Sequence, residues 1–366
     1  MKKIKVCFLA YTDYGNTMTY WSHAINKYST KYESKIICIT PHQFQYEINH
    51  DVDLSISNEN GALNIDQAKK NEAIEWILQC DQIIFAEEMS LFNNPRRYKS
   101  MQVFQQILGF HLLELKMSNP LLKLHIWHCG IDYRLAHKQF DEINEQYFDK
   151  ILLGGDLYRL SPKTKKYYVP IVSYQTKESN GDIFKLILKK FNDDIIKVFH
   201  APSSHSTKGT ETIRKVVQEV FNQLPSYLND KVVYEEITPP VKNVEIIEMK
   251  KKSHIYIDQY HQDIGGYGIS SVEALAYGNI VLSSIHCMEP DALELQCQSK
   301  EMAKEFPIID TSLDLEVFKN KLIKLLVTPK IELRDKAIKS FEFYQKLFTF
   351  KAISNYFEQI IFNFEE

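Results

Sequence analysis

The chain has 366 residues, of which 25% are charged, and its formal net charge is −3. A chain of this length exceeds what one hydrophobic core usually supports, so we expect two domains. The nearly balanced charge does not favour an extended nucleic-acid surface, and no segment provides the ~20 apolar residues that a spanning helix requires. Scattered cysteines and the lack of signal-peptide features at the start of the chain predict a cytoplasmic protein.

Short apolar runs alternate with segments of helical period through the first half, which predicts a parallel sheet with crossover helices. The predicted strands are 4–10, 35–40, 82–86, 123–128 and 150–153. The predicted helices include 20–28, 71–79 and 98–116. The polar, proline-bounded stretch 161–170 is suited to a linker, and we place a domain boundary near residue 172.

The same alternation restarts in the second half of the chain. The predicted strands there are 195–200, 231–234, 254–257 and 280–283. The last ~40 residues have the spacing of consecutive amphipathic helices rich in aromatic side chains. We therefore predict an α/β protein with Rossmann-like domains over 1–172 and 173–344, and a final helix, about 345–366, that joins the N-terminal domain.

A glycine-rich loop follows the predicted strand 254–257 and leads into a helix that opens near Ile269 and closes at Gly278. The loop contains three glycines, Gly265, Gly266 and Gly268. Bare backbone N–H groups and the positive end of a helix dipole suit a diphosphate. Glu273 lies about one turn into this helix. The alternative is that the glycines only form a tight turn and that Glu273 is a solvated helix residue.

A second strand, loop and helix start lies at 198–213. At the end of its loop, Lys208 can reach a phosphate oxygen as a point charge. Nearby hydroxyl donors are Ser203, Ser204 and Thr210. Taken alone, Lys208 is typical of a surface lysine. Because both loops follow strands of one domain, and ligands of open α/β sheets bind at the carboxyl ends of strands, we expect a single anion site there.

The segments from His200 to Thr210 and from Gly265 to Gly278 together resemble the donor domain of GT-B glycosyltransferases of family 4, over roughly 195–285. The resemblance implies the GT-B fold, in which two Rossmann-like domains with parallel sheets face an interdomain cleft. It also implies that Lys208 contacts the donor pyrophosphate and that Glu273 holds the ribose hydroxyls. The full set of predicted donor contacts is Gly15, Ser203, Ser204, Lys208, Gly209, Gly265, Gly266, Tyr267, Gly268, Ile269 and Glu273.

Two positions depart from the family pattern. Many members carry a glutamate eight residues before the position of Glu273, where this chain has Gly265. The basic residue that often precedes the lysine falls at Pro202. These departures bear on sugar orientation and phosphate neutralisation more than on nucleotide binding.

The N-terminal half carries a weaker resemblance, over 123–134. In related transferases this strand-to-loop segment faces the cleft, which implies that His128 lies beside the transferred sugar and acts with Lys208 and Glu273 in catalysis. Asp132 and Arg134 would then shape the sugar or acceptor site. The alternative for Asp132 and Arg134 is a local ion pair that organises the loop.

Two further groups follow predicted strands of the first half. Gly15 lies in a segment that resembles the flexible glycine loop facing the donor, and an ordinary βα turn is its alternative. Glu87 and Glu88 follow strand 82–86 and are candidates to recognise an acceptor hydroxyl or to accept its proton. Their alternative is a charge pair at a helix N-terminus.

The expected function is transfer of a sugar from a nucleotide diphosphate donor, a UDP-sugar or alternatively a GDP-sugar, to a saccharide or lipid-linked saccharide. The resemblance implies a retaining reaction without metal or cofactor. The alternatives are a non-catalytic GT-B-like binding or chaperone subunit, and a sugar-nucleotide epimerase or hydrolase. Basic runs at 163–166 and 248–252 leave open a peripheral contact with the inner membrane face, and their alternative is a solvated surface.

Overall fold

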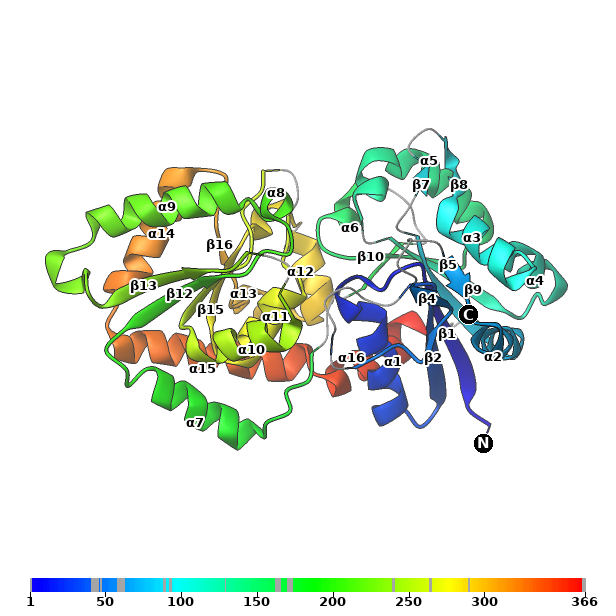
Figure 1. Cartoon of the computed structure of the whole chain (residues 1–366), viewed down its shortest axis with the longest axis horizontal. Helices are drawn as coiled ribbons and strands as arrows, with labels where there is room; N and C mark the ends of the chain where they lie inside the picture. Colours follow the sequence, from blue (N-terminus) through cyan, green and yellow to red (C-terminus); the bar gives the residue numbers. More distant parts are fainter. Residues whose placement is uncertain are drawn as a thin grey trace. The chain divides into compact units, whose positions relative to one another are not determined.

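In the computed structural model the chain forms two compact units, each built on its own parallel sheet with helices on both faces (Figure 1). The described residues are 2–40, 46, 48–57, 63–87, 90–91, 94–128, 130–161, 166–169, 174–238, 241–262, 265–288 and 290–363. Unit 1 comprises the described residues within 1–43, 47–170 and 353–366. Unit 2 comprises those within 44–46 and 171–352.

Unit 1 has a seven-stranded sheet in the order β11-β10-β9-β6-β1-β2-β3, and every pair in it is parallel. Its strands are β1 Ile4–Ala10, β2 Tyr32–Cys38, β3 Val52–Asp53, β6 Gln82–Glu87, β9 Lys123–His128, β10 Lys150–Leu153 and β11 Lys166–Tyr168. The central strands are apolar and buried because helices cover both faces. Two antiparallel ribbons complete the unit: β4 Ser55–Ser57 with β5 Leu63–Ile65, and β7 Ser90–Leu91 with β8 Asn94–Tyr98.

The helical elements of unit 1 are η1 Tyr14–Asn16, α1 Thr17–Tyr28, α2 Gln67–Leu78, α3 Lys99–Leu108, α4 Leu112–Ser118, α5 Ile131–Tyr147 and α6 Leu157–Leu160. The chain returns to the unit through α16 Phe350–Tyr356 and the π-helical turn η4 Phe357–Ile361. The ring of Phe357 packs 5.1 Å from that of Trp21 on α1. The last helix of the chain is thereby part of the core of unit 1.

The single helix predicted over 98–116 is wrong, because two helices, α3 and α4, occupy this range. Gly109 ends the first helix with a left-handed φ of +88°. His111 then begins the second: its side chain accepts from the N–H of Leu113, and Glu114 bonds back to the N–H of His111. This capping box starts a new helix after the glycine stop.

The stretch 161–170, predicted as a linker, contains the edge strand β11. Lys166 pairs with Ile151 of β10, and the parallel register continues to Tyr168. The two consecutive tyrosines favour a strand, and an edge position tolerates the polar residues around it. The polar composition of this stretch, from which a linker was predicted, belongs to an edge strand of the sheet.

Lys150, on β10, holds the C-terminal segment in place. Its ammonium donates to the carbonyls of Ile360, Ile361 and Asn363 at 3.1, 2.8 and 2.7 Å, and the residue is only 3% exposed. These carbonyls lie at the end of a helical turn, where the last C=O groups have no partner within the helix itself. Burial lowers the pKa of Lys150 to about 8, while the neighbouring Asp149 raises it.

Lys150→Met is expected to destabilise unit 1 by about 2–4 kcal/mol, because three carbonyls lose a charged donor. Urea unfolding followed by tryptophan fluorescence measures this loss in unit 1 alone, since all three tryptophans, Trp21, Trp76 and Trp127, lie there. Lys31→Met, at an exposed lysine, is the matched control and should leave the midpoint unchanged. Equal midpoints for the two variants would contradict the role of Lys150.

Unit 2 has a five-stranded parallel sheet in the order β13-β12-β14-β15-β16. Its strands are β12 Ile196–His200, β13 Val232–Glu236, β14 Ile255–Ile257, β15 Ile280–Ser283 and β16 Ile309–Asp310. Its helical elements are α7 Asn180–Lys190, α8 His205–Lys208, α9 Thr210–Gln223, η2 Ser226–Leu228, α10 Asn243–Lys252, α11 Ile269–Ala276, η3 Ile285–Cys287, α12 Pro290–Cys297, α13 Lys300–Lys304, α14 Leu315–Val327 and α15 Lys330–Leu347. In Figure 1, α9 and α14 lie on one face of the sheet and α10, α11 and α15 on the other.

The strand order of unit 2 reverses between β12 and β14. These strands are neighbours in the sheet, although β13 lies between them in the chain. The segments that leave them run in opposite directions across the sheet, which opens a crevice at their carboxyl ends. In such sheets, this reversal is where ligands bind.

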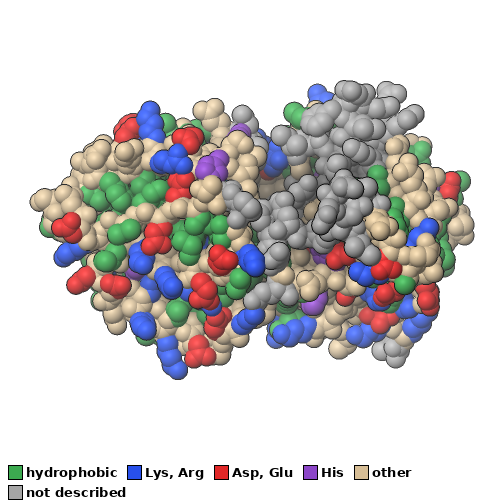
Figure 2. Space-filling view, viewed as in Figure 1, with side chains coloured by type: hydrophobic (Ala, Val, Ile, Leu, Met, Phe, Trp, Pro, Cys, Tyr) green, Lys and Arg blue, Asp and Glu red, His purple; other side chains and the backbone are tan. Residues whose placement is uncertain are grey.

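Positive and negative side chains are interspersed on the face of unit 2 that Figure 2 presents. Among the described residues, no helix is long and apolar enough to cross a membrane.

Candidate functional site

Two loops meet at the carboxyl ends of β12 and β14. Gly209 follows the first loop with a φ of +65°, and a Cβ on it would lie 1.9 Å from the carbonyl oxygen of Tyr260 in the second loop. The N–H of Tyr260 donates to the carbonyl of Lys208 at 3.0 Å. Only glycine therefore allows the two backbones to lie this close.

Lys208 points from the first loop to the second. Its Nζ donates to Asp258 Oδ1 at 2.7 Å and to Gln259 Oε1 at 3.0 Å. It also lies 3.8 Å from where a Cβ on Gly268 would be, beside the start of α11. An ammonium has three donors, so one N–H has no acceptor among the described residues, and the side chain keeps 15% of its surface exposed.

Asp258 connects the lysine to the helix. Its second oxygen, Oδ2, accepts from the N–H of Gly268 at 3.1 Å and from Ser271 Oγ at 2.7 Å. Burial of the fully buried carboxylate opposes ionisation, but the Lys208 charge and these hydrogen bonds outweigh it, so the pKa of Asp258 lies below its ordinary value. The carboxylate thus stays charged and holds both the lysine and the helix cap in position.

The first turn of α11 keeps open backbone donors. Among the residues that the structure describes, none accepts from the N–H groups of Ile269 and Ser270. Both residues are half-buried, so a ligand can approach them. Free N–H groups at the positive end of a helix dipole favour an anion.

The corresponding helix start in unit 1 is closed by the protein itself. Asp13, which is fully buried, accepts from the N–H groups of Met18 and Thr19 at 2.9 and 2.8 Å and from the Thr19 hydroxyl. Gly15 lies in this turn with a φ of +62°, next to Asn16 at +58°. Because an internal carboxylate occupies the start of α1, this helix start is not an open anion position, and a donor contact for Gly15 remains a prediction.

Glu273 lies on α11, one turn below the open donors, and is 1% exposed. Lys250, fully buried on α10, donates to Glu273 Oε2 at 2.5 Å and to Ser270 Oγ at 2.8 Å. Asn243 donates to Glu273 Oε1 at 2.9 Å. Each carboxylate oxygen has a protein donor in this structure, so Glu273 is first a partner of Lys250, and its contact with a ribose remains a prediction.

The other predicted donor residues lie around this centre. Ser203 is exposed, and the hydroxyl of Ser204 bonds to that of Ser206 at 3.2 Å. Gly265 and Gly266 are buried, and Gly266 has a φ of +110° and donates to the carbonyl of Ser284 at 2.7 Å. These two glycines therefore build the turn that leads to Gly268.

Tyr267 contributes to packing rather than to an open surface. Its ring lies 5.4 Å from that of Phe306 and 5.9 Å from that of Phe348, and its hydroxyl donates to Gln296. The residue is 7% exposed. Only its backbone remains for the donor contact that the resemblance implies.

His128, at the end of β9 in unit 1, is 1% exposed and stacks on Tyr133 with ring centroids 4.4 Å apart. The amide of Asn144 donates to its Nε2 at 2.9 Å, so the remaining ring proton is on Nδ1. Burial lowers the pKa of His128 to about 3, which makes the imidazole neutral at physiological pH. A position beside the transferred sugar remains a prediction.

Arg134 forms a bidentate ion pair in unit 1. Its Nε and Nη2 donate to the two oxygens of Asp156 at 2.6 and 2.8 Å. Asp132 lies on α5 and Glu87 at the end of β6, but their side chains lie outside the described part of the structure, as does Glu88 entirely. The acceptor roles of these residues remain predictions.

The basic run 248–252 is largely engaged within unit 2. Lys250 is buried against Glu273, and Lys251 forms ion pairs with Glu178 and Glu248 at 2.6 Å each. In the other run, Lys166 donates to the carbonyls of its own unit, and 163–165 lie outside the described residues. Neither run is a block of unpaired lysines in the described structure.

Three residues of the cluster, Asp258, Asn243 and Lys250, were not predicted. Asp258 directly follows a buried strand, which places it at the ligand edge of the sheet, although no motif marks it. Lys250 lies three residues after the buried Ile247, on the face of α10 that turns inward. A lysine at a core position of an amphipathic helix is the signal that could have identified it.

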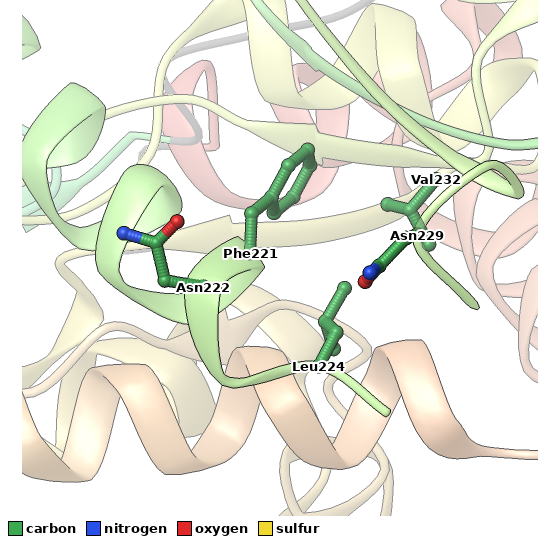
Figure 3. A pocket seen from close by; sticks show the side chains of 5 residues that line it. All are labelled: Phe221, Asn222, Leu224, Asn229 and Val232. Atoms are coloured by element: carbon green, nitrogen blue, oxygen red, sulfur yellow. The ribbon is translucent and has the colours of Figure 1, made fainter. Parts of the chain in front are cut away.

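A surface pocket of unit 2 lies away from this cluster (Figure 3). It is lined by Phe221, Asn222, Leu224, Asn229 and Val232. Val232 begins β13, whereas Lys208 and Asp258 follow the carboxyl ends of β12 and β14, which are parallel to it. The pocket therefore lies toward the amino ends of the strands, whereas the candidate site lies at their carboxyl ends.

Solved structures share this architecture over nearly the whole chain. The N-terminal domain of trehalose-6-phosphate phosphatase from Candida albicans has a TM-score of 0.60 at 10% identity and covers 98% of this chain and 97% of its own. Anabaena HepE, solved with UDP and glucose, has a TM-score of 0.54 at 11% identity, covering 97% and 98%. The pneumococcal O-GlcNAc transferase GtfA, solved with UDP and GlcNAc, has a TM-score of 0.54 at 10% identity, covering 98% of both chains.

The fold is GT-B. The prediction of two parallel-sheet α/β domains is thereby confirmed. No protein-family model matches the sequence, and neither does any curated protein. The GT-B assignment thus rests on the structure, and membership of family 4 remains a prediction.

Proposed function

We propose that the protein transfers a sugar from a nucleoside diphosphate to an acceptor hydroxyl. The observation that carries the proposal is the open first turn of α11: the N–H groups of Ile269 and Ser270 follow Gly268, and the Lys208 ammonium lies 3.8 Å from the Cβ position of that glycine. The GT-B proteins HepE and GtfA, which were solved with UDP and a sugar, support a UDP-sugar as donor. A GDP-sugar is the alternative donor, and family 4 is the family that we propose.

The proposed reaction breaks the bond between the anomeric carbon and the diphosphate oxygen. The acceptor hydroxyl forms the new bond to that carbon, and its proton passes to the departing diphosphate. Negative charge therefore grows on the diphosphate as the bond breaks. Lys208 and the α11 donors are already fixed by Asp258, so they can stabilise this charge without rearrangement and without a metal ion.

Unit 1 is proposed to hold the acceptor, a saccharide or a lipid-linked saccharide, with retention of the anomeric configuration. Candidate contacts are His128, Glu87, Glu88, Asp132 and Arg134. We propose that the acceptor half comprises 1–172 together with the final helix of about 345–366, and that the donor half comprises 173–344.

A thermal-shift screen with UDP, GDP, UDP-glucose, UDP-GlcNAc and GDP-mannose tests the donor class. A ligand that binds only the folded state at 100 times its Kd stabilises that state by about 2.7 kcal/mol, so at least one of these compounds should raise the Tm by several degrees. Adenosine at the same concentration, which lacks the diphosphate, is the control. A flat response to every nucleotide would remove the proposed donor site.

Donor chemistry without acceptor separates the alternatives. Incubation with the bound sugar nucleotide alone should leave the sugar configuration unchanged and release nucleoside diphosphate slowly. Conversion to an epimer, or fast release of free sugar, would identify an epimerase or hydrolase instead. Tight binding without transfer to any acceptor of a broad panel would identify a binding subunit.

A further inference from the structure

The side-chain amide oxygen of Asn243, beside Glu273, accepts no hydrogen bond from the described residues. Asn243 is the first residue of α10, and its side-chain amide contacts the carboxylate at 2.9 Å. A carboxylate only accepts, so the amide nitrogen must face Glu273 and the amide oxygen must point away from it. Among the described residues, none donates to that oxygen.

The surroundings of Glu273 fix the orientation of this amide. Lys250 holds Oε2 and also bonds Ser270 in the first turn of α11, so the carboxylate cannot turn away from Asn243. Glu273 is 1% exposed, whereas Asn243 is half-buried. Asn243 is therefore the member of the cluster that a ligand can reach.

The cluster lies at a suitable distance from the open donors of α11. Glu273 is four residues after Ile269 and three after Ser270, which corresponds to about 4.5–6 Å along the helix axis. A nucleoside diphosphate bound at the first turn would place its ribose, rather than its phosphates, at that depth. The ligand group nearest to Asn243 would then be a hydroxyl, which can donate to an amide oxygen.

We propose that Asn243 recognises the ribose of the bound nucleotide by accepting a hydrogen bond from a ribose hydroxyl at its amide oxygen. This inference rests on the proposed function and names a specificity residue for the donor site. Lys250 and Glu273 act as positioning residues, since they orient the amide. The protein therefore discriminates against nucleotides that lack the contacted hydroxyl.

Isothermal titration with UDP, 2′-deoxy-UDP and 3′-deoxy-UDP tests the proposal, with GDP and its two deoxy forms as a second set. The wild-type chain should bind the ribonucleotide about tenfold more tightly than one of its deoxy forms, as the loss of one hydrogen bond predicts. In Asn243→Leu, which keeps the side-chain size, this preference should fall below about twofold. The deoxy form should bind the variant and the wild type equally.

Asn222→Leu is the matched control, because Asn222 lines the remote pocket of Figure 3. This variant should keep the wild-type preference, and far-UV circular dichroism should show both variants folded. An unchanged preference in Asn243→Leu would overturn the role of Asn243 and leave the proposed function standing. Failure of the wild type to bind either ribonucleotide would overturn the proposed function and this inference with it.

Discussion

Lys250→Met is expected to lower the free energy of unfolding of unit 2 by about 3–5 kcal/mol, because it leaves the carboxylate of Glu273 buried without its cation. Both side chains are at most 2% exposed. Far-UV circular dichroism in urea measures the loss. Tryptophan fluorescence should be less sensitive to it, since the three tryptophans lie in unit 1.

A double variant separates pairing from packing. Lys250→Met with Glu273→Leu removes both charges and should recover most of the lost stability, since apolar replacement of a whole buried pair is often neutral. Lys252→Met, two residues along α10 at an exposed lysine, is the matched control and should change stability by less than about 0.5 kcal/mol. If the double variant is no more stable than Lys250→Met, the ion pair is not the cause.

Lys208→Met is expected to reduce release of nucleoside diphosphate from the sugar nucleotide by about 10²–10³-fold, the effect of removing one fixed donor from a developing negative charge. Initial rates measured with a competent acceptor report the loss in kcat/KM. The binding of UDP should weaken less than the rate falls, because the charge on the diphosphate grows in the transition state.

Stability must be followed in the same variant, because Lys208→Met also leaves Asp258 buried without its ion-pair partner. The double variant Lys208→Met with Asp258→Asn removes both charges of the ion pair. It should therefore regain stability and remain inactive. Full activity in either folded variant would remove Lys208 from the mechanism. A stable double variant with low activity would assign the loss to chemistry rather than to folding.

Much of the framework follows from short-range patterns. The strands at 4–10, 123–128, 150–153 and 280–283 have the predicted bounds, because they are apolar runs between clear turn signals. The short edge strands β3, β11 and β16 were not predicted, because two or three residues are too few to show the alternation of apolar and polar residues that marks a strand. The helix break at Gly109 is marked in the sequence only by that glycine and by the capping box that follows it.

The candidate site is harder to predict, because its contacts join distant parts of the chain. Lys208 and Asp258 are 50 residues apart in sequence, and Lys250 and Glu273 are 23 apart. The glycine loop and Lys208 are recognisable as local patterns. Asp258 after its strand and Lys250 within its basic run can be assigned to the site only once the fold brings them to their partners. Composition suggested a solvated surface for Lys250, and packing placed it in the core.

The hydrogen bonds of Lys150 have a consequence for synthesis on the ribosome. Its first carbonyl partner is 210 residues further along the chain, so at 5–20 residues per second translation reaches that partner roughly 10–40 s after it has passed Lys150. Until then the sheet of unit 1 lacks the segment that covers part of it, including Phe357 beside Trp21. The half that is translated first is therefore the last to complete its fold.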